Sequence, residues 1–136
     1  MVTSDHIEIT LPCKAEYVSV ARLTTSGIAS RCGFDIETVE DTKVAVSEVC
    51  NRIINAAANA GEQYKISFDI YSDRLTVTFT SISDNLECIF NDDEDGFGMA
   101  IINAFMDNVE FCPQNDKYVL AMTKYFGVGA GNGIQI

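Results

Sequence analysis

Residues 35–60 narrow the choice of folds more than any other segment, because they predict one long helix with two different faces. Asp35 suits the N-cap position, and Gly61 suits the point where a helix ends. At about 100° per residue, the apolar side chains gather on one side. They are Val39, Val46, Val49, Ile53 and Ala57. This stripe has to be covered, so we expect the helix to pack on a hydrophobic layer.

The opposite face of this helix is polar and centres on Glu48. Six side chains fall within about 60° of it, counting Glu48 itself. They are Asp41, Glu48, Asn51, Arg52, Asn55 and Asn59. Amides suit the coordination of a ligand, metal or water, and a carboxylate can accept a proton from an attacking hydroxyl. The residues alone leave two interpretations open, a solvated face and a functional site.

The remaining segments predict a two-layer α+β sandwich, in which three main helices lie on one face of a mostly antiparallel sheet. Apolar and polar residues alternate in the predicted strands. The strands are 7–11, 66–70, 75–79, 109–112 and 117–126. Two further helices are predicted over 14–32, ending at Gly33, and from Gly96 to about residue 107. Tight turns are predicted at 72–73 and 113–116, and a surface loop at 83–95.

The length of 136 residues fits one domain, which we place at residues 1–126. Residues 127–136 have glycine at every second position up to Gly133, and no helix is predicted after them. This pattern indicates a flexible tail rather than a phosphate-binding loop. No apolar run approaches the ~20 residues that cross a bilayer, and the first residues do not resemble a signal peptide. We therefore expect a cytoplasmic protein that does not bind a membrane.

The net charge of −11 disfavours binding to nucleic acid, because an acidic surface repels phosphates. It suits either a basic protein partner or simple solubility, and charge alone does not separate the two. The five cysteines are scattered without a CxxC pair, and His6 is the single histidine. This composition argues against a zinc site and indicates reduced thiols.

Two segments resemble motifs of the bacterial anti-sigma-factor serine-protein kinases, within the histidine kinase-like ATPase superfamily. Residues 45–51, AVSEVCN, followed by Ala56-Ala57, resemble the N-box helix of that family. Residues 96–102, GFGMAII, with the MDNV stretch at 106–109, resemble its second glycine box. The predicted order of elements agrees over roughly residues 6–126. The resemblance implies ATP and magnesium as cofactors, a sigma factor and an anti-anti-sigma (STAS-domain) protein as partners, and a homodimer.

The resemblance also implies roles for particular residues. Glu48 stands where the family has its general base, and Gly96 and Gly98 match the loop that approaches the nucleotide phosphates. Arg52 replaces the family's magnesium-binding asparagine, and we assign it, together with Ser81, to the cofactor-binding residues. Asn51 and Asn55 share the face of Glu48, so we assign them as substitute metal and cofactor ligands.

Two departures bear on catalysis. Ser81 stands where the family has the adenine-reading aspartate of its DxGxG box, and the glycines of that box are absent too. The acidic run 92–95 would oppose a polyphosphate unless magnesium or Arg52 offsets it. These departures leave open a pseudokinase that binds partners without using ATP. A structural domain that shares only the architecture is a third interpretation.

Overall fold

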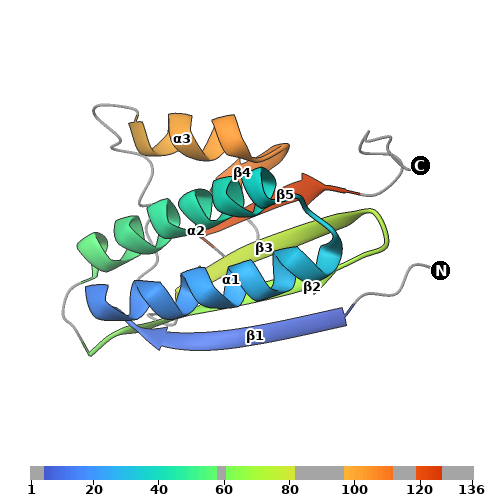
Figure 1. The fold of residues 1–136 in the computed structure, drawn as a ribbon. Helices are drawn as coiled ribbons and strands as arrows, with labels where there is room; N and C mark the ends of the chain where they lie inside the picture. Colours follow the sequence, from blue (N-terminus) through green and yellow to red (C-terminus); the bar gives the residue numbers. More distant parts are fainter. Residues whose placement is uncertain (1–4, 58–60, 82–96, 112–118, 127–136) are drawn as a thin grey trace, which may run out of the picture.

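The computed structural model describes residues 5–57, 61–81, 97–111 and 119–126. Within them, an antiparallel sheet in the order β1-β2-β3-β5-β4 is covered on one face by three α-helices (Figure 1). The strands are β1 (Asp5–Pro12), β2 (Gln63–Ile70), β3 (Arg74–Ser81), β4 (Asn108–Phe111) and β5 (Leu120–Tyr125). The helices are η1 (Ala15–Tyr17, a 3₁₀ turn), α1 (Val18–Cys32), α2 (Ile36–Ala56) and α3 (Phe97–Phe105). The predicted α+β sandwich is confirmed.

The predicted helix boundaries were less accurate than the predicted order. The segment from residue 14 to residue 32 is a 3₁₀ turn followed by α1, rather than one helix. The α2 helix ends at Ala56, because Ala57 adopts extended backbone angles. The α3 helix ends at Phe105, because the backbone N–H of Asp107 donates to the Thr123 carbonyl at 2.9 Å and starts the pairing of β4 with β5. The predicted loop 83–95, turn 113–116 and tail 127–136 lie outside the described residues.

The predicted caps and the first turn are present. The Asp35 carboxylate accepts a hydrogen bond from the backbone N–H of Thr38 at 2.8 Å and so caps α2. Gly33 follows α1 with a φ of 93°, which favours glycine because it lacks a Cβ. Between β2 and β3, the N–H of Tyr71 donates to the Arg74 carbonyl at 2.9 Å and closes the turn around 72–73.

The core lies between the sheet and the helices. On α2, the buried side is the predicted stripe, with Val39, Val46, Val49 and Ile53 at most 6% exposed, and Ala57, directly after the helix, is partly buried. Asn55, on the other face, is exposed, so the predicted orientation of the helix is confirmed. On the sheet, the side chains that meet this stripe alternate along β2, β3 and β5. The fully buried ones include Tyr64, Ile66, Phe68, Leu75, Val77, Phe79, Leu120 and Met122.

The α2 helix is the central helix of the upper layer, with α1 on one side and α3 on the other (Figure 1). Arg22 of α1 donates to the Ser47 hydroxyl of α2 at 2.6 Å, and Ser47 donates to the Lys43 carbonyl at 2.9 Å. The first of these bonds joins one flank of α2 to α1, and the second orients the Ser47 hydroxyl within α2. The other flank is left to meet α3, where Glu48 lies. Among the described residues, no helix is long and apolar enough to cross a membrane.

Candidate functional site

The α2 helix meets the first turn of α3 at Glu48, Arg52 and Gly98. Glu48 and Arg52 are one turn apart on α2 and half-buried, and Gly98 is buried. A Cβ placed at Gly98 would lie 2.6 Å from Nη2 of Arg52 and 3.0 Å from Oε2 of Glu48. The carboxylate and the guanidinium therefore converge on the backbone at the start of α3.

Glycine is needed at position 98 for this approach. A real Cβ has almost no contacts shorter than 3.0 Å, so any other residue would displace the Arg52 guanidinium. The first N–H groups of a helix have no partner within the helix, and they carry its positive end. We call this place, where α2 meets the first turn of α3 at Glu48, Arg52 and Gly98, the crossing. It brings together a carboxylate, a permanent cation and a helix N-terminus. This combination can accept a proton and can hold an anion.

The other predicted site residues of α2 are more exposed. Asn51 and Asn55 are exposed, whereas Glu48 and Arg52 are half-buried. Their amides share the polar face of the helix as predicted, and their roles as metal and cofactor ligands stay predictions. Gly96 lies outside the described residues.

Ser81 is the last residue of β3, directly opposite Tyr64 of β2 in the strand register. Alternation along the two strands places both on the sheet face that the helices cover. Tyr64 is fully buried, and its hydroxyl has the Cys50 thiol, a weak hydrogen-bonding group, as a polar neighbour within the part of the chain that the structure describes. Burial raises the pKa of Tyr64, and the neighbouring Cys50 thiol raises it further. A buried hydroxyl with only a weak partner costs stability, so the strand position opposite Ser81 carries a poorly satisfied polar group.

Tyr64 was missed in the sequence because the predicted strand began at Ile66. The signal was nevertheless present, because Tyr64 continues the alternation of Ile66 and Phe68. A tyrosine at a core position carries a hydroxyl that normally finds a partner. Cys50, from α2, is buried as expected for a reduced core thiol, and burial raises its pKa to about 11.

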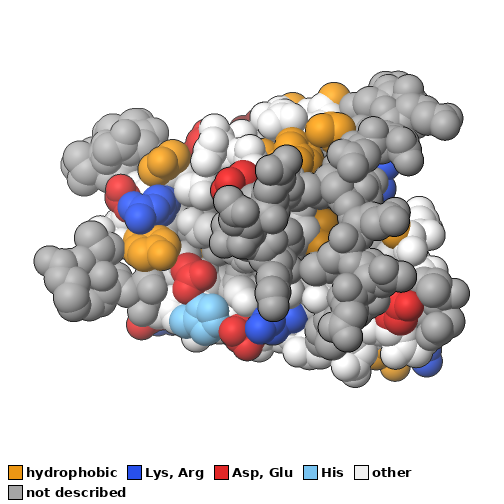
Figure 2. Space-filling model, turned by 180° about the vertical axis from the view of Figure 1, so that it is seen from behind, with side chains coloured by type: hydrophobic (Ala, Val, Ile, Leu, Met, Phe, Trp, Pro, Cys, Tyr) orange, Lys and Arg blue, Asp and Glu red, His pale blue; other side chains and the backbone are white. Residues whose placement is uncertain are grey.

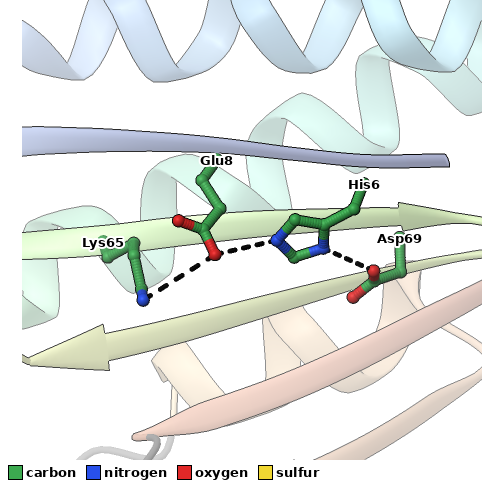
Figure 3. Close-up of polar contacts among 4 residues, drawn as sticks. All are labelled: His6, Glu8, Lys65 and Asp69. Carbon is green, nitrogen blue, oxygen red and sulfur yellow. Dashed lines mark hydrogen bonds and ion pairs between the residues drawn. The ribbon is translucent and has the colours of Figure 1, made fainter.

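A separate polar cluster lies on the sheet face that the helices leave open. His6 of β1 hydrogen-bonds through Nδ1 to Asp69 of β2 at 2.6 Å and through Nε2 to Glu8 at 2.8 Å (Figure 3). Lys65 lies 3.8 Å from the same Glu8 oxygen. The hydrogen bond that Asp69 accepts from His6 raises the pKa of His6 most, followed by the bond that Glu8 accepts, and this second bond lowers the pKa of Glu8. From behind, the histidine is seen at the surface among acidic and basic side chains (Figure 2).

Comparison with known proteins identifies the family to which this fold and this crossing belong. The model of the histidine kinase-like ATPase domain matches residues 11–124, which include α2, α3 and every strand from β2 to β4. The chain belongs to the RsbW-like histidine kinase-like ATPases. The resemblance inferred from the two motifs is confirmed.

Several curated serine-protein kinases named RsbW are similar to the chain over most of its length. That of Halalkalibacterium halodurans is 36% identical over 134 residues, covering 88% of this chain and 82% of the relative. That of Oceanobacillus iheyensis is 38% identical over 144 aligned positions, covering 92% and 89%. That of Bacillus velezensis is 33% identical over 138, covering 89% and 86%.

The two cofactors that the family implies fit these residues unequally. The glycine approach at the start of α3 suits the phosphates of ATP. A magnesium ion does not fit beside Arg52, because a guanidinium has no acceptor atom and repels a second cation. The described residues around Gly98 therefore suit an anion better than a metal cation.

Proposed function

We propose that this chain is an anti-sigma factor that binds a sigma factor and phosphorylates an anti-anti-sigma STAS protein on serine, using ATP, in the cytoplasm. The observation that carries the proposal is the approach of the Glu48 carboxylate to Gly98 at the N-terminus of α3. The similarity to proteins named serine-protein kinases supports the same reaction type.

Each side chain of the crossing has a definite task in this proposal. Glu48 takes the proton from the partner's serine hydroxyl as the serine oxygen forms its bond to the γ-phosphorus. The bond from that phosphorus to the bridging oxygen of ADP breaks at the same time. Gly98 lets the backbone N–H groups of α3 approach the phosphates, and Arg52 neutralises part of their charge. Ser81 and Tyr64 lie at the end of the sheet where the family reads the adenine base. Asn51 and Asn55 contribute amides at the rim.

The proposed protein partners are inferred from the net charge of the chain and from its family. A net charge of −11 suits association with a basic surface on a sigma factor, and the affinity should fall as salt screens it. A homodimer is part of the same proposal.

The proposal is tested with sigma factors and STAS proteins from the same organism and ATP labelled in the γ-phosphate. We expect the chain to retain one sigma factor in a pull-down and to transfer label to a serine of one STAS protein. A STAS variant with that serine changed to alanine is the matched control. Retention of neither partner class would refute the regulatory function.

The second candidate is a pseudokinase that binds the same partners without transferring phosphate. Two features favour it, namely Ser81 in place of the adenine-reading aspartate and Arg52 in place of the asparagine. Losing a hydrogen bond to a charged group costs about 1.5–3 kcal/mol, which corresponds to about ten-fold or more in affinity. We therefore expect ATP to bind more weakly than to intact members of the family. Calorimetry decides this point, since micromolar or tighter binding would contradict the expectation. Partner retention without label transfer would favour the pseudokinase.

A further inference from the structure

Arg52 places a positive charge at the crossing, next to the start of α3 where the phosphates of a nucleotide would bind. Its Nη2 and Cζ atoms lie 2.6 Å and 3.4 Å from the position of a Cβ at Gly98, and Oε2 of Glu48 lies 3.0 Å from that position. Since both charged groups reach within 3.0 Å of one point, Nη2 and Oε2 are at most about 6 Å apart. The guanidinium and the carboxylate thus both lie against the start of α3.

A guanidinium at this place excludes a divalent cation for two reasons. Arginine stays protonated at every pH that a folded protein tolerates, so its charge repels a cation permanently. Its nitrogen atoms are all donors, whereas magnesium requires oxygen ligands at about 2.0–2.1 Å in near-octahedral geometry. Asn51 and Asn55 offer only neutral amide oxygens, and the charge of the nearby Glu48 carboxylate is already balanced by the guanidinium itself.

The same guanidinium can do what a metal does for phosphates. Its planar fork donates two parallel hydrogen bonds to phosphate oxygens and carries the charge that neutralises them. We infer that Arg52 replaces the divalent cation at this site, so that the chain binds a nucleoside triphosphate as the metal-free anion. This inference rests on the proposed function for the existence of a nucleotide site, and it adds the ionic form of the ligand.

The inference is tested by titrating the full chain with ATP, once with excess magnesium and once with EDTA. For the natural sequence we expect dissociation constants within about two-fold of each other in the two buffers. Arg52→Asn should weaken binding about ten-fold or more in EDTA, and magnesium should restore part of the loss. Arg52→Lys keeps the charge but not the fork, so its binding should be weaker and still indifferent to magnesium.

Arg31→Asn is the matched control, because it removes one positive charge from the exposed end of α1, on the other side of α2 from α3. It should leave both constants unchanged. Thermal unfolding of each variant verifies that the fold is intact.

Two results would overturn the inference alone. One is binding to the natural sequence that requires magnesium, and the other is an Arg52→Asn variant as indifferent to magnesium as its parent. Absence of ATP binding in either buffer, up to millimolar nucleotide, would overturn the inference together with the nucleotide part of the proposed function. Partner binding would then be the part of the proposal that survives.

Discussion

Charged side chains cluster in two regions of this molecule, and strand pairing explains the cluster in only one of them. On the open face of the sheet, His6 lies opposite Asp69 in the register of β1 and β2, and Glu8 is two residues along the same strand. At the crossing of α2 and α3, Glu48 and Arg52 are half-buried against a glycine that has no room for a side chain. The first cluster is what neighbouring strands produce when polar residues alternate outward.

The second group cannot be explained in that way. Half-burying an acid and a base at a helix crossing costs solvation, and an apolar pair would pack there more cheaply. A half-buried charge pair at a helix crossing is a better guide to function than a pair that follows from strand pairing. The comparison predicts that changes at the crossing alter chemistry with small effects on stability. Changes on the open face of the sheet should alter stability slightly and leave the chemistry and ATP binding unchanged.

The largest expected effect is that of Glu48→Gln. If Glu48 is the general base, phosphoryl transfer to a partner serine should fall about 10²–10⁴-fold, while stability stays nearly unchanged. The assay is transfer of labelled phosphate, with thermal unfolding measured in parallel. Glu40→Gln is the matched control, because Glu40 is exposed on the same helix and pairs with Lys43 at 3.1 Å. Unaltered transfer in the Glu48 variant would remove the assignment.

Gly98→Ala should have the next largest effect. The added Cβ would meet Nη2 of Arg52 at 2.6 Å, and the flexible end of that side chain would move aside. We expect ATP affinity to fall about ten-fold, because the fork would lose its alignment, and stability to change by less than about 1 kcal/mol.

Gly27→Ala provides the control for the Gly98 variant. Gly27 lies within α1, and a Cβ there would contact nothing within 4 Å. This variant should be more stable by about 0.5–1 kcal/mol with unchanged ATP binding. Equal binding by both alanine variants would mean that the close approach at Gly98 serves packing alone.

Tyr64→Phe tests the buried hydroxyl of Tyr64. Because that hydroxyl is buried with the Cys50 thiol as a weak partner, its removal should stabilise the nucleotide-free protein by at most about 1 kcal/mol. Urea unfolding measures the change. Tyr125→Phe, at an exposed position, should alter stability by less than about 0.5 kcal/mol. A loss of stability in the Tyr64 variant would mean that the hydroxyl is satisfied in the folded protein.

The sequence predicted the fold well because the fold depends on periodicity. The stripe from Val39 to Ile53 and the alternation along β2 and β3 report burial directly, and the structure confirms both. The Asp35 cap was also readable, since capping is a local interaction. Helix ends were predicted less accurately, because the end of α3 is set by the bond from Asp107 to Thr123, which is far away in the sequence.

The site could be predicted only as a set of residues. Motif resemblance selected Glu48 and Gly98 from separate segments, and their meeting depends on how α2 crosses α3. The position of Arg52 was visible as a substitution, whereas its contact with the start of α3 required the packing of two helices. The His6 cluster was invisible for a similar reason, because it needs the register of β1 against β2.

The smallest expected effect belongs to the open face and concerns pH. The pKa of His6 is raised, so its contribution to stability is fully present below its unfolded value of about 6.5 and is lost as pH rises through the higher folded value. The pKa of Glu8 is lowered, so its contribution is present above its unfolded value of 4.5 and is lost as pH falls through the lower folded value. The pairing should therefore be strongest between these limits, at mildly acidic pH. Melting temperatures measured from about pH 5 to about pH 9 should decline slightly above about pH 6.5. His6→Gln, which cannot become charged, should remove that decline and leave ATP binding unchanged. An equal decline in the variant would mean that other groups cause it, and altered ATP binding would break the separation between the two regions.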